Sequence, residues 1–267
     1  MTTASSAVTG SATRWGPLWG SRPADWALSE DQQLPTYEAA LARTGLERGW
    51  RVLDVGCGVG AFLKLVADRS GRPHGIDASE ALVAFARRRL PHADLRVGEM
   101  EDLPWDDDTF DLVTGFNSFF FANDMIAALR EAGRVAKPRA PVVIQVWGVH
   151  ERCDFEAMKQ VARPFLPPRP LDAPPDPDLS QRGALRALAT QAGLTPEDEF
   201  DAAWASEYPD EKTLGRALVA VAGLATLVAP EREPELTTAI VDGLAPYRRA
   251  DGSYRLSNEY HYLLARA

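Results

Sequence analysis

A glycine-rich segment, Val52 to Gly60, holds the residues whose types and spacing are most informative about chemistry. Gly56, Gly58 and Gly60 follow a short apolar run, and a pattern with helical spacing begins directly after them. A glycine turn between a strand and a helix lets a ligand approach the backbone closely, and it presents amide donors at the helix start. Asp77 ends the next predicted strand, 21 residues after Gly56, where a carboxylate can accept hydrogen bonds from both hydroxyls of a ribose.

Strands and helices alternate through the segment that contains this turn. The first expected strand is a short apolar run at Arg51–Val55, and the fifth, at Pro141–Trp147, is dense in Val and Ile. The second, third and fourth are short segments at Arg72–Asp77, Leu95–Glu99 and Phe110–Gly115. This alternation predicts an α/β fold with a doubly wound sheet covered by helices on both faces.

Later elements are less regular. Pro196–Ser206 is expected to be a sixth strand, Ser180 to cap a helix that runs to Ala192, and 210–228 to be one continuous helix. Seven prolines within 164–178 predict an irregular, semi-rigid loop.

Four segments resemble class I S-adenosylmethionine-dependent methyltransferases, in the broad branch that includes the ubiquinone and menaquinone methyltransferases. They are Asp54-x-Gly56-x-Gly58-x-Gly60, Gly75–Ser79, Gly98–Trp105 and Phe110–Val113. The resemblance covers residues 49–147 in the right order and is weaker on either side. It implies a Rossmann-like mixed sheet of seven strands, with the closing segment Tyr254–Ala265 antiparallel beside the fifth strand.

The resemblance also implies a cofactor, S-adenosyl-L-methionine, with S-adenosyl-L-homocysteine as product. Gly56, Cys57, Gly58 and Gly60 would pass under its methionine part, and Asp54 would order that turn. Asp77 would hold the ribose hydroxyls, with Ala78 against adenine. The remaining implied contacts are Glu99, Met100 and Glu101 on the adenine side and Phe116 and Asn117 at the amino-acid end.

Other interpretations of this segment stay open. An Asp at a strand end commonly caps the following helix, and this applies to Asp54 and Asp77. A nicotinamide-dependent oxidoreductase also uses a glycine turn with an acidic ribose partner, but its glycines follow the pattern Gly-x-Gly-x-x-Gly. A non-catalytic S-adenosylmethionine-binding protein is the other alternative.

Methyl transfer from a sulfonium is an in-line displacement with a neutral leaving group, so orientation and desolvation can supply most of the catalysis. A base is needed only if the acceptor must lose a proton. His150 alone among the four histidines follows the C-terminal end of the fifth strand, which makes it the candidate catalytic base. A surface or hydrogen-bonded histidine is the ordinary alternative.

Aromatic residues concentrate where the acceptor would bind. The candidate substrate residues are Trp19, Trp26, Tyr37, Phe119, Phe120 and Trp147, with Trp15 in the same N-terminal cluster. They favour a small aromatic or apolar acceptor. The tryptophans would alternatively pack the N-terminal segment onto the core. We expect residues 1–48 to form cap helices over the site, 49–148 the cofactor-binding core, and 149–267 a proline-rich and helical lid with the closing strands.

The amino-acid composition limits the kinds of molecule that the protein is expected to bind. The 38 acidic and 29 basic side chains give a formal net charge of −9, which argues against binding of nucleic acid. Neither a signal peptide nor a membrane-spanning run is recognisable, and two cysteines make no disulfide framework, so a cytoplasmic protein is expected. Asp106–Asp108 are expected to form a solvated turn, and no metal is predicted. The sequence does not predict an oligomeric state.

Overall fold

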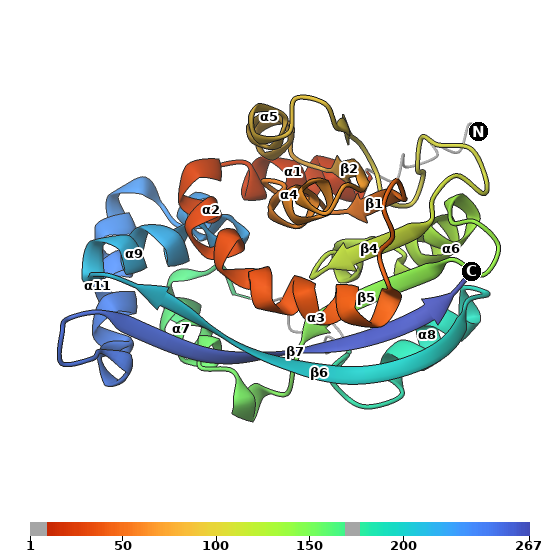
Figure 1. The fold of residues 1–267 in the computed structure, drawn as a ribbon. Coiled ribbons are helices and arrows are strands. Elements are labelled where there is room, and N and C mark those ends of the chain that lie inside the picture. Colours follow the sequence, from red (N-terminus) through yellow and green to blue (C-terminus); the bar gives the residue numbers. More distant parts are fainter. Residues whose placement is uncertain (1–9, 169–176) are drawn as a thin grey trace, which may run out of the picture.

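The structure is a computed structural model that describes residues 10–168 and 177–267. Its centre is one sheet in the order β3-β2-β1-β4-β5-β7-β6 (Figure 1). Strands β1 to β5 are parallel, whereas β7 runs antiparallel between β5 and β6. The strands are β1 (Arg51–Val55), β2 (Arg72–Asp77), β3 (Asp94–Val97), β4 (Leu112–Phe116), β5 (Pro141–Trp147), β6 (Thr195–Tyr208) and β7 (Tyr254–Arg266). This confirms the expected doubly wound, seven-stranded mixed sheet and the antiparallel insertion of the closing segment.

Helices cover both faces of this sheet. Apolar side chains of α3 (Leu34–Thr44), α4 (Ala61–Asp68) and α5 (Glu80–Arg89) form one buried cluster with the sheet. Those of α6 (Met125–Val135) and α8 (Ala184–Gln191) form another cluster. The sheet is therefore the middle layer of a three-layer sandwich, as parallel strands with few polar side chains require.

The remaining helices lie away from these layers. Strands β6 and β7 run beyond the parallel strands, and α7 (Phe155–Ala162), α9 (Glu211–Ala220), α10 (Leu224–Leu227) and α11 (Glu233–Gly243) gather at their far end (Figure 1). A third apolar cluster joins α7, α9 and α11 to Tyr208, Tyr254 and Leu256 of the two long strands. At the other end of the chain lie α1 (Ser11–Trp19) and α2 (Pro23–Glu30), which we call the cap.

Three sequence-based boundaries are wrong for identifiable reasons. Strand β4 begins at Leu112 because the Asp111 carboxylate accepts a hydrogen bond from Arg51 N (2.8 Å) instead of continuing the strand. Helix α8 begins at Ala184, since Ser180 donates its N–H and hydroxyl to Asp178 and stays in a turn. The expected helix 210–228 is interrupted after Ala220, where Val221 is extended (ψ 130°), and a second short helix begins after Gly223, which has φ +68°.

Smaller differences concern the third strand and the loop after α7. Strand β3 covers Asp94–Val97 and not Leu95–Glu99. Residues 169–176 of the predicted proline-rich loop lie outside the described residues. No helix within the described ranges is long and apolar enough to cross a bilayer.

Candidate functional site

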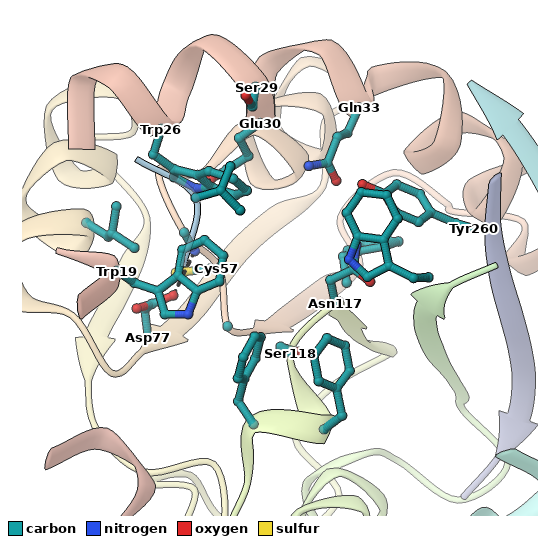
Figure 2. Close-up of a pocket in the computed structure, with 18 of the residues that line it drawn as sticks. Trp19, Trp26, Ser29, Glu30, Gln33, Cys57, Asp77, Asn117, Ser118 and Tyr260 are labelled. Carbon is teal, nitrogen blue, oxygen red and sulfur yellow. Dashed lines mark hydrogen bonds between the residues drawn. The ribbon is translucent and has the colours of Figure 1, made fainter. Parts of the chain in front are cut away.

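A pocket with a cavity volume of about 280 Å³ lies at the C-terminal ends of the parallel strands, beneath the cap helices (Figure 2). It gathers most of the residues predicted from sequence, from segments far apart in the chain. The predicted residues that line it are Trp19, Trp26, Tyr37, Asp54, Gly56, Cys57, Gly58, Asp77, Ala78, Met100, Phe116, Asn117, Phe120 and Trp147, together with Trp15. A cavity of this size accommodates parts of small molecules and not a folded macromolecule.

The glycine turn between β1 and α4 is held by its own amides. Gly56 N and Cys57 N both donate to Ile76 O of β2, at 2.8 and 3.0 Å. The three glycines have φ between +53° and +83°, a region in which other residues are strained. A Cβ on Gly56 would lie 2.4 Å from Ser118 Cβ. The turn therefore requires glycine for both conformation and space.

Asp77 closes this turn from the end of β2. Its Oδ2 accepts a hydrogen bond from Gly58 N (2.9 Å), and its Oδ1 accepts one from Ser79 N (2.8 Å). Burial raises the pKa of Asp77, although these two backbone hydrogen bonds act in the opposite direction. Each carboxylate oxygen keeps further acceptor capacity, and the residue lines the pocket.

Asp54 lies deeper, at the end of β1. It is buried and accepts a hydrogen bond from Thr114 Oγ1 at 2.7 Å. Burial raises the pKa of Asp54 well above its usual range, with Glu30 and Asp77 adding to the effect. Its contact with β4 ties the glycine turn to the neighbouring strand.

Glu30, at the end of α2, was not predicted from the sequence. Its carboxylate accepts hydrogen bonds from Val59 N (2.9 Å) and Ala61 N (3.0 Å) at the start of α4, and from Trp26 Nε1 (2.6 Å). Its side chain points from the cap into the pocket, opposite Asp77 and Cys57 (Figure 2). Burial raises the pKa of Glu30 to about 7, against the opposing effect of these hydrogen bonds.

Glu99 and Glu101 hold the cap and do not line the pocket. Glu99 Oε2 accepts hydrogen bonds from Ser11 Oγ and Ala12 N, both at 2.8 Å. Glu101 Oε2 lies 2.9 Å from the same Ser11 hydroxyl, whose one hydrogen is shared between the two carboxylates. Both carboxylates therefore anchor the first turn of α1, which places the cap over the pocket.

The predicted aromatic residues serve two purposes. Trp19 contacts Trp26 edge to face, with ring centroids 4.9 Å apart, and it also packs on Phe121 at 5.7 Å. Tyr37 packs on Phe116 in the same way, at 4.7 Å. The tryptophans thus pack the N-terminal segment onto the core and line the pocket as well, so the two interpretations of their role are compatible.

Besides Glu99 and Glu101, three further predicted residues lie outside the lining. His150 has a side chain that is 65% exposed and pairs with Glu156, with His150 Nδ1 3.1 Å from Glu156 Oε1. Phe119 is fully buried beneath Gly115, and Gly60 packs against α5. The structure does not bring the imidazole of His150 to the pocket.

Sequence reasoning missed the far wall of the pocket. Its residues come from the cap, from α7 and from the long antiparallel strands, and include Ser29, Gln33, Phe155, Lys159, Trp204, Ser206, Tyr208, Asn258 and Tyr260. A signal was available in the alternate aromatic residues of the closing strands, Trp204 with Tyr208 and Tyr260 with Tyr262. Because the two residues of each pair are separated by an even number of positions in a strand, their side chains lie on the same face of the sheet.

Comparison with known proteins agrees with this geometry. A family model described as "Methyltransferase domain" matches residues 53–144. A demethylmenaquinone methyltransferase of Halalkalibacterium halodurans is 34% identical over 111 residues, which cover 39% of this chain and 45% of the relative. A trans-aconitate 2-methyltransferase of Variovorax paradoxus is 27% identical over 252 residues, 91% of this chain and 93% of the relative.

One solved structure shares the fold over most of the chain. The [4+2]-cyclase SpnF superposes with a TM-score of 0.57 at 22% identity, over 86% of this chain and 80% of its own. At this identity the similarity concerns the fold alone. The chain spans about half the length of the first curated relatives that it matches.

The glycine turn, the carboxylate at the end of β2 and the family match agree with one another. Residues 53–144 belong to a methyltransferase domain, which supports the sequence resemblance to class I S-adenosylmethionine-dependent methyltransferases.

Proposed function

We propose that the protein transfers the methyl group of S-adenosylmethionine to a small aromatic or apolar acceptor. S-adenosylmethionine supplies a methyl group on a positively charged sulfur, which leaves as a neutral thioether. The protein therefore has to bind a cation, orient the acceptor in line and exclude water.

The position of Glu30 is the observation that carries this proposal. Dinucleotide-binding proteins use the amides at the start of this helix for the cofactor's pyrophosphate. Here Glu30 already accepts hydrogen bonds from two of those amides, Val59 N and Ala61 N. A second anion beside this carboxylate would be repelled, which argues against a nicotinamide-dependent oxidoreductase.

Charge in the pocket favours a cationic cofactor. Glu30, Asp54 and Asp77 all line it, and Lys159 is the one basic side chain in its lining among the described residues. The pKa values of all three carboxyl groups are raised, chiefly by burial, so a bound positive charge would relieve an unfavourable environment. Asp77, at the end of β2, is placed to accept hydrogen bonds from a ribose.

Catalysis would rest on position and desolvation, without a histidine base. Burial raises the pKa of Tyr260 well above its usual range, so this hydroxyl stays protonated and acts as a hydrogen-bonding group. We propose that residues 1–48 cap the cofactor, that 49–148 bind it, and that 149–267 supply the acceptor side. Because the cap and the long strands cover the pocket, we expect a small acceptor and not nucleic acid.

A carboxylic acid is the second candidate acceptor. It is suggested by the relative named as a trans-aconitate 2-methyltransferase, which matches nearly the whole chain. The acidic lining of the pocket favours the uncharged alternative.

Incubation of the protein with S-adenosylmethionine and a panel of phenols, quinone-like compounds, amines and trans-aconitate tests the proposal. We expect S-adenosylhomocysteine to form only with the true acceptor, whose mass rises by one methyl group. Binding of S-adenosylhomocysteine without turnover on any member would favour the non-catalytic alternative. Turnover on a folded protein or on RNA would contradict a small-molecule acceptor.

A further inference from the structure

The pocket has two chemically different ends. The end beside β1 and β2 holds Asp77 and the glycine turn, whereas the end beside β5, β6 and β7 is built mostly from aromatic rings. Figure 2 shows Asp77 and Trp19 on one side and Tyr260 on the other, with Asn117 close to Tyr260. Resting on the proposed function, the second end is the acceptor chamber, lined by Asn117, Trp147, Phe155, Trp204 and Tyr260.

Rings in this chamber pack in fixed orientations. Trp147 stacks on Phe155 with centroids 4.7 Å apart and an interplanar angle of 10°. Trp204 stacks on Tyr260 at 5.2 Å and 26°, and Tyr260 meets Trp147 edge to face at 4.9 Å. Side chains that support one another in this way form rigid apolar walls, which suit a flat ligand.

Two polar atoms in these walls have no protein partner. Trp204 Nε1 and Asn117 Oδ1 are buried and make no hydrogen bond within the described residues. A buried donor or acceptor without a partner costs free energy, so such atoms usually bind a ligand or an ordered water. Gln145 Oε1 is also without a partner, but Gln145 does not line the pocket.

The backbone at Asn117 is held in an unusual conformation. Its φ is +51°, and its N–H donates to Gln145 O at 3.1 Å. A hydrogen bond with the Asn117 side chain acts to lower the pKa of Tyr260, although burial is the larger effect and raises it. Asn117 is therefore fixed between β4 and the closing strand, and one end of its amide remains for a ligand.

Charge in the chamber excludes a polyanion. Lys159, the one basic side chain lining the pocket among the described residues, is paired with Glu156 on the same helix. Neither of the two unpartnered atoms carries a charge, so together they complement one hydrogen-bond donor and one acceptor on an uncharged molecule.

We propose that Asn117 Oδ1 and Trp204 Nε1 are the two polar anchors of the acceptor, a flat uncharged aromatic molecule with two oxygen functions. One of these functions is a hydroxyl, which donates to Asn117. The other oxygen accepts a hydrogen bond from the Trp204 indole. Asn117 is thereby assigned to the acceptor and not to the methionine end of the cofactor.

Calorimetry on protein saturated with S-adenosylhomocysteine tests this assignment, with dihydroxynaphthalene isomers, 2-naphthol, naphthalene and trans-aconitate as probes. We expect at least one diol to bind about tenfold more tightly than 2-naphthol, because it satisfies the second anchor. The Trp204→Phe variant keeps the ring and removes the donor, so it should erase most of this advantage and leave the affinity for 2-naphthol unchanged. Asn117→Gly, which tolerates the positive φ, should weaken the diol and 2-naphthol alike.

Trp50→Phe is the matched control, since Trp50 packs in a core cluster and does not line the pocket. It should leave every probe affinity unchanged. Three results would overturn the assignment: no diol preferred over 2-naphthol, an equal loss for naphthalene and diol in Trp204→Phe, or tightest binding of trans-aconitate. Failure to saturate the protein with S-adenosylhomocysteine would instead contradict the proposed function itself.

Discussion

Asp77 and Glu30 contact successive amides of one turn, since Asp77 accepts a hydrogen bond from Gly58 N and Glu30 one from Val59 N. At the scale of residues, only the first of them was predictable. Asp77 follows a strand at a fixed distance from the glycines, which is a local pattern. Glu30 lies 29 residues before Val59, at the end of an ordinary helix, and only the tertiary fold brings it to the turn.

Replacing Asp77 tests the ribose assignment. Asp77→Ala should weaken binding of S-adenosylhomocysteine by about 1.5–3 kcal/mol for each charged hydrogen bond lost, which is roughly tenfold or more. Calorimetry measures this, and thermal unfolding checks that the variant is folded. Asp68→Ala, on the exposed side of α4, serves as control. An unchanged affinity in a folded variant would contradict the assignment.

The raised pKa of Glu30 predicts that cofactor binding depends on pH. In the free protein burial raises its pKa to about 7, and a bound cation favours the charged form. Affinity for S-adenosylmethionine should therefore rise by roughly fivefold to tenfold between about pH 6 and pH 7.5, with release of a proton. Calorimetry in buffers of different ionisation enthalpy detects that proton. A flat profile would show that Glu30 does not sense the cofactor.

The same raised pKa has the opposite consequence for the stability of the free protein. Between the ordinary pKa of 4.5 and about 7, the folded state holds a proton on Glu30 that the unfolded state has released. Stability therefore falls as pH rises through this window. Denaturant titrations across that range should show the fall, and Glu30→Gln should make it smaller, because Asp54 and Asp77, whose pKa values are also raised, contribute in the same direction.

At the scale of elements, the turn from β1 to α4 admits a sharper test. A Cβ on Gly58 would lie 2.2 Å from Glu30 Oε2, and the residue has φ +53°. Gly58→Ala should displace Glu30 and the end of α2, and so weaken cofactor binding as well as stability. Gly45→Ala is the matched control, because Gly45 has φ +71° with nothing within 4 Å of a Cβ. It should cost about 1 kcal/mol of stability and leave binding unchanged, as measured by denaturation and calorimetry. Equal effects of the two substitutions on cofactor binding and on stability would contradict the steric account.

The pairing of β6 with β7 buries a histidine between two carboxylates. His261 Nδ1 lies 2.6 Å from Asp201 Oδ1, and Nε2 lies 3.0 Å from Glu199 Oε1. Burial acts to raise the pKa of Glu199, but hydrogen bonds from Gly183, His261 and Arg186 outweigh it and hold the pKa below its usual value.

Removing this histidine should destabilise the closing strands. His261→Leu is expected to cost about 2–4 kcal/mol, because it leaves a buried carboxylate with fewer partners. A lowered pKa at Glu199 stabilises the fold above about pH 4.5, and this contribution is lost as pH falls below that value. Urea denaturation of wild type and variant at pH 7 and pH 4 measures both effects. A difference in stability that is the same at the two pH values would contradict the coupling.

Elements of the parallel core were predictable because each is a local pattern. Apolar runs mark β1 and β5, and the N-cap of α5 is Ser79, a residue type that favours this position, whose side chain accepts a hydrogen bond from Leu82 N. The extension of β6 and β7 was not predictable, because their far ends are held by α7, α9 and α11 through contacts distant in sequence. The chamber walls that depend on those strands were missed for the same reason.

At the scale of the whole molecule, the cap helices, the parallel core and the closing strands all contribute residues to the lining of the same pocket. The cap is joined to the far end of the molecule by ion pairs of Arg22 with Glu233 and of Arg216 with Asp25. Partly exposed pairs of this kind add little stability individually, so the cap is held chiefly by buried contacts such as the hydrogen bonds from Val59 N and Ala61 N to Glu30.

The most direct test of the central claim, a pocket built for the adenosyl cofactor of a methyltransferase and not for a dinucleotide, is a pair of calorimetric titrations of the same protein with S-adenosylhomocysteine and with NAD. The account predicts saturable one-to-one binding of S-adenosylhomocysteine and no heat of binding from NAD, because Glu30 holds the amides that a pyrophosphate would need. Saturable binding of NAD without binding of S-adenosylhomocysteine would contradict it.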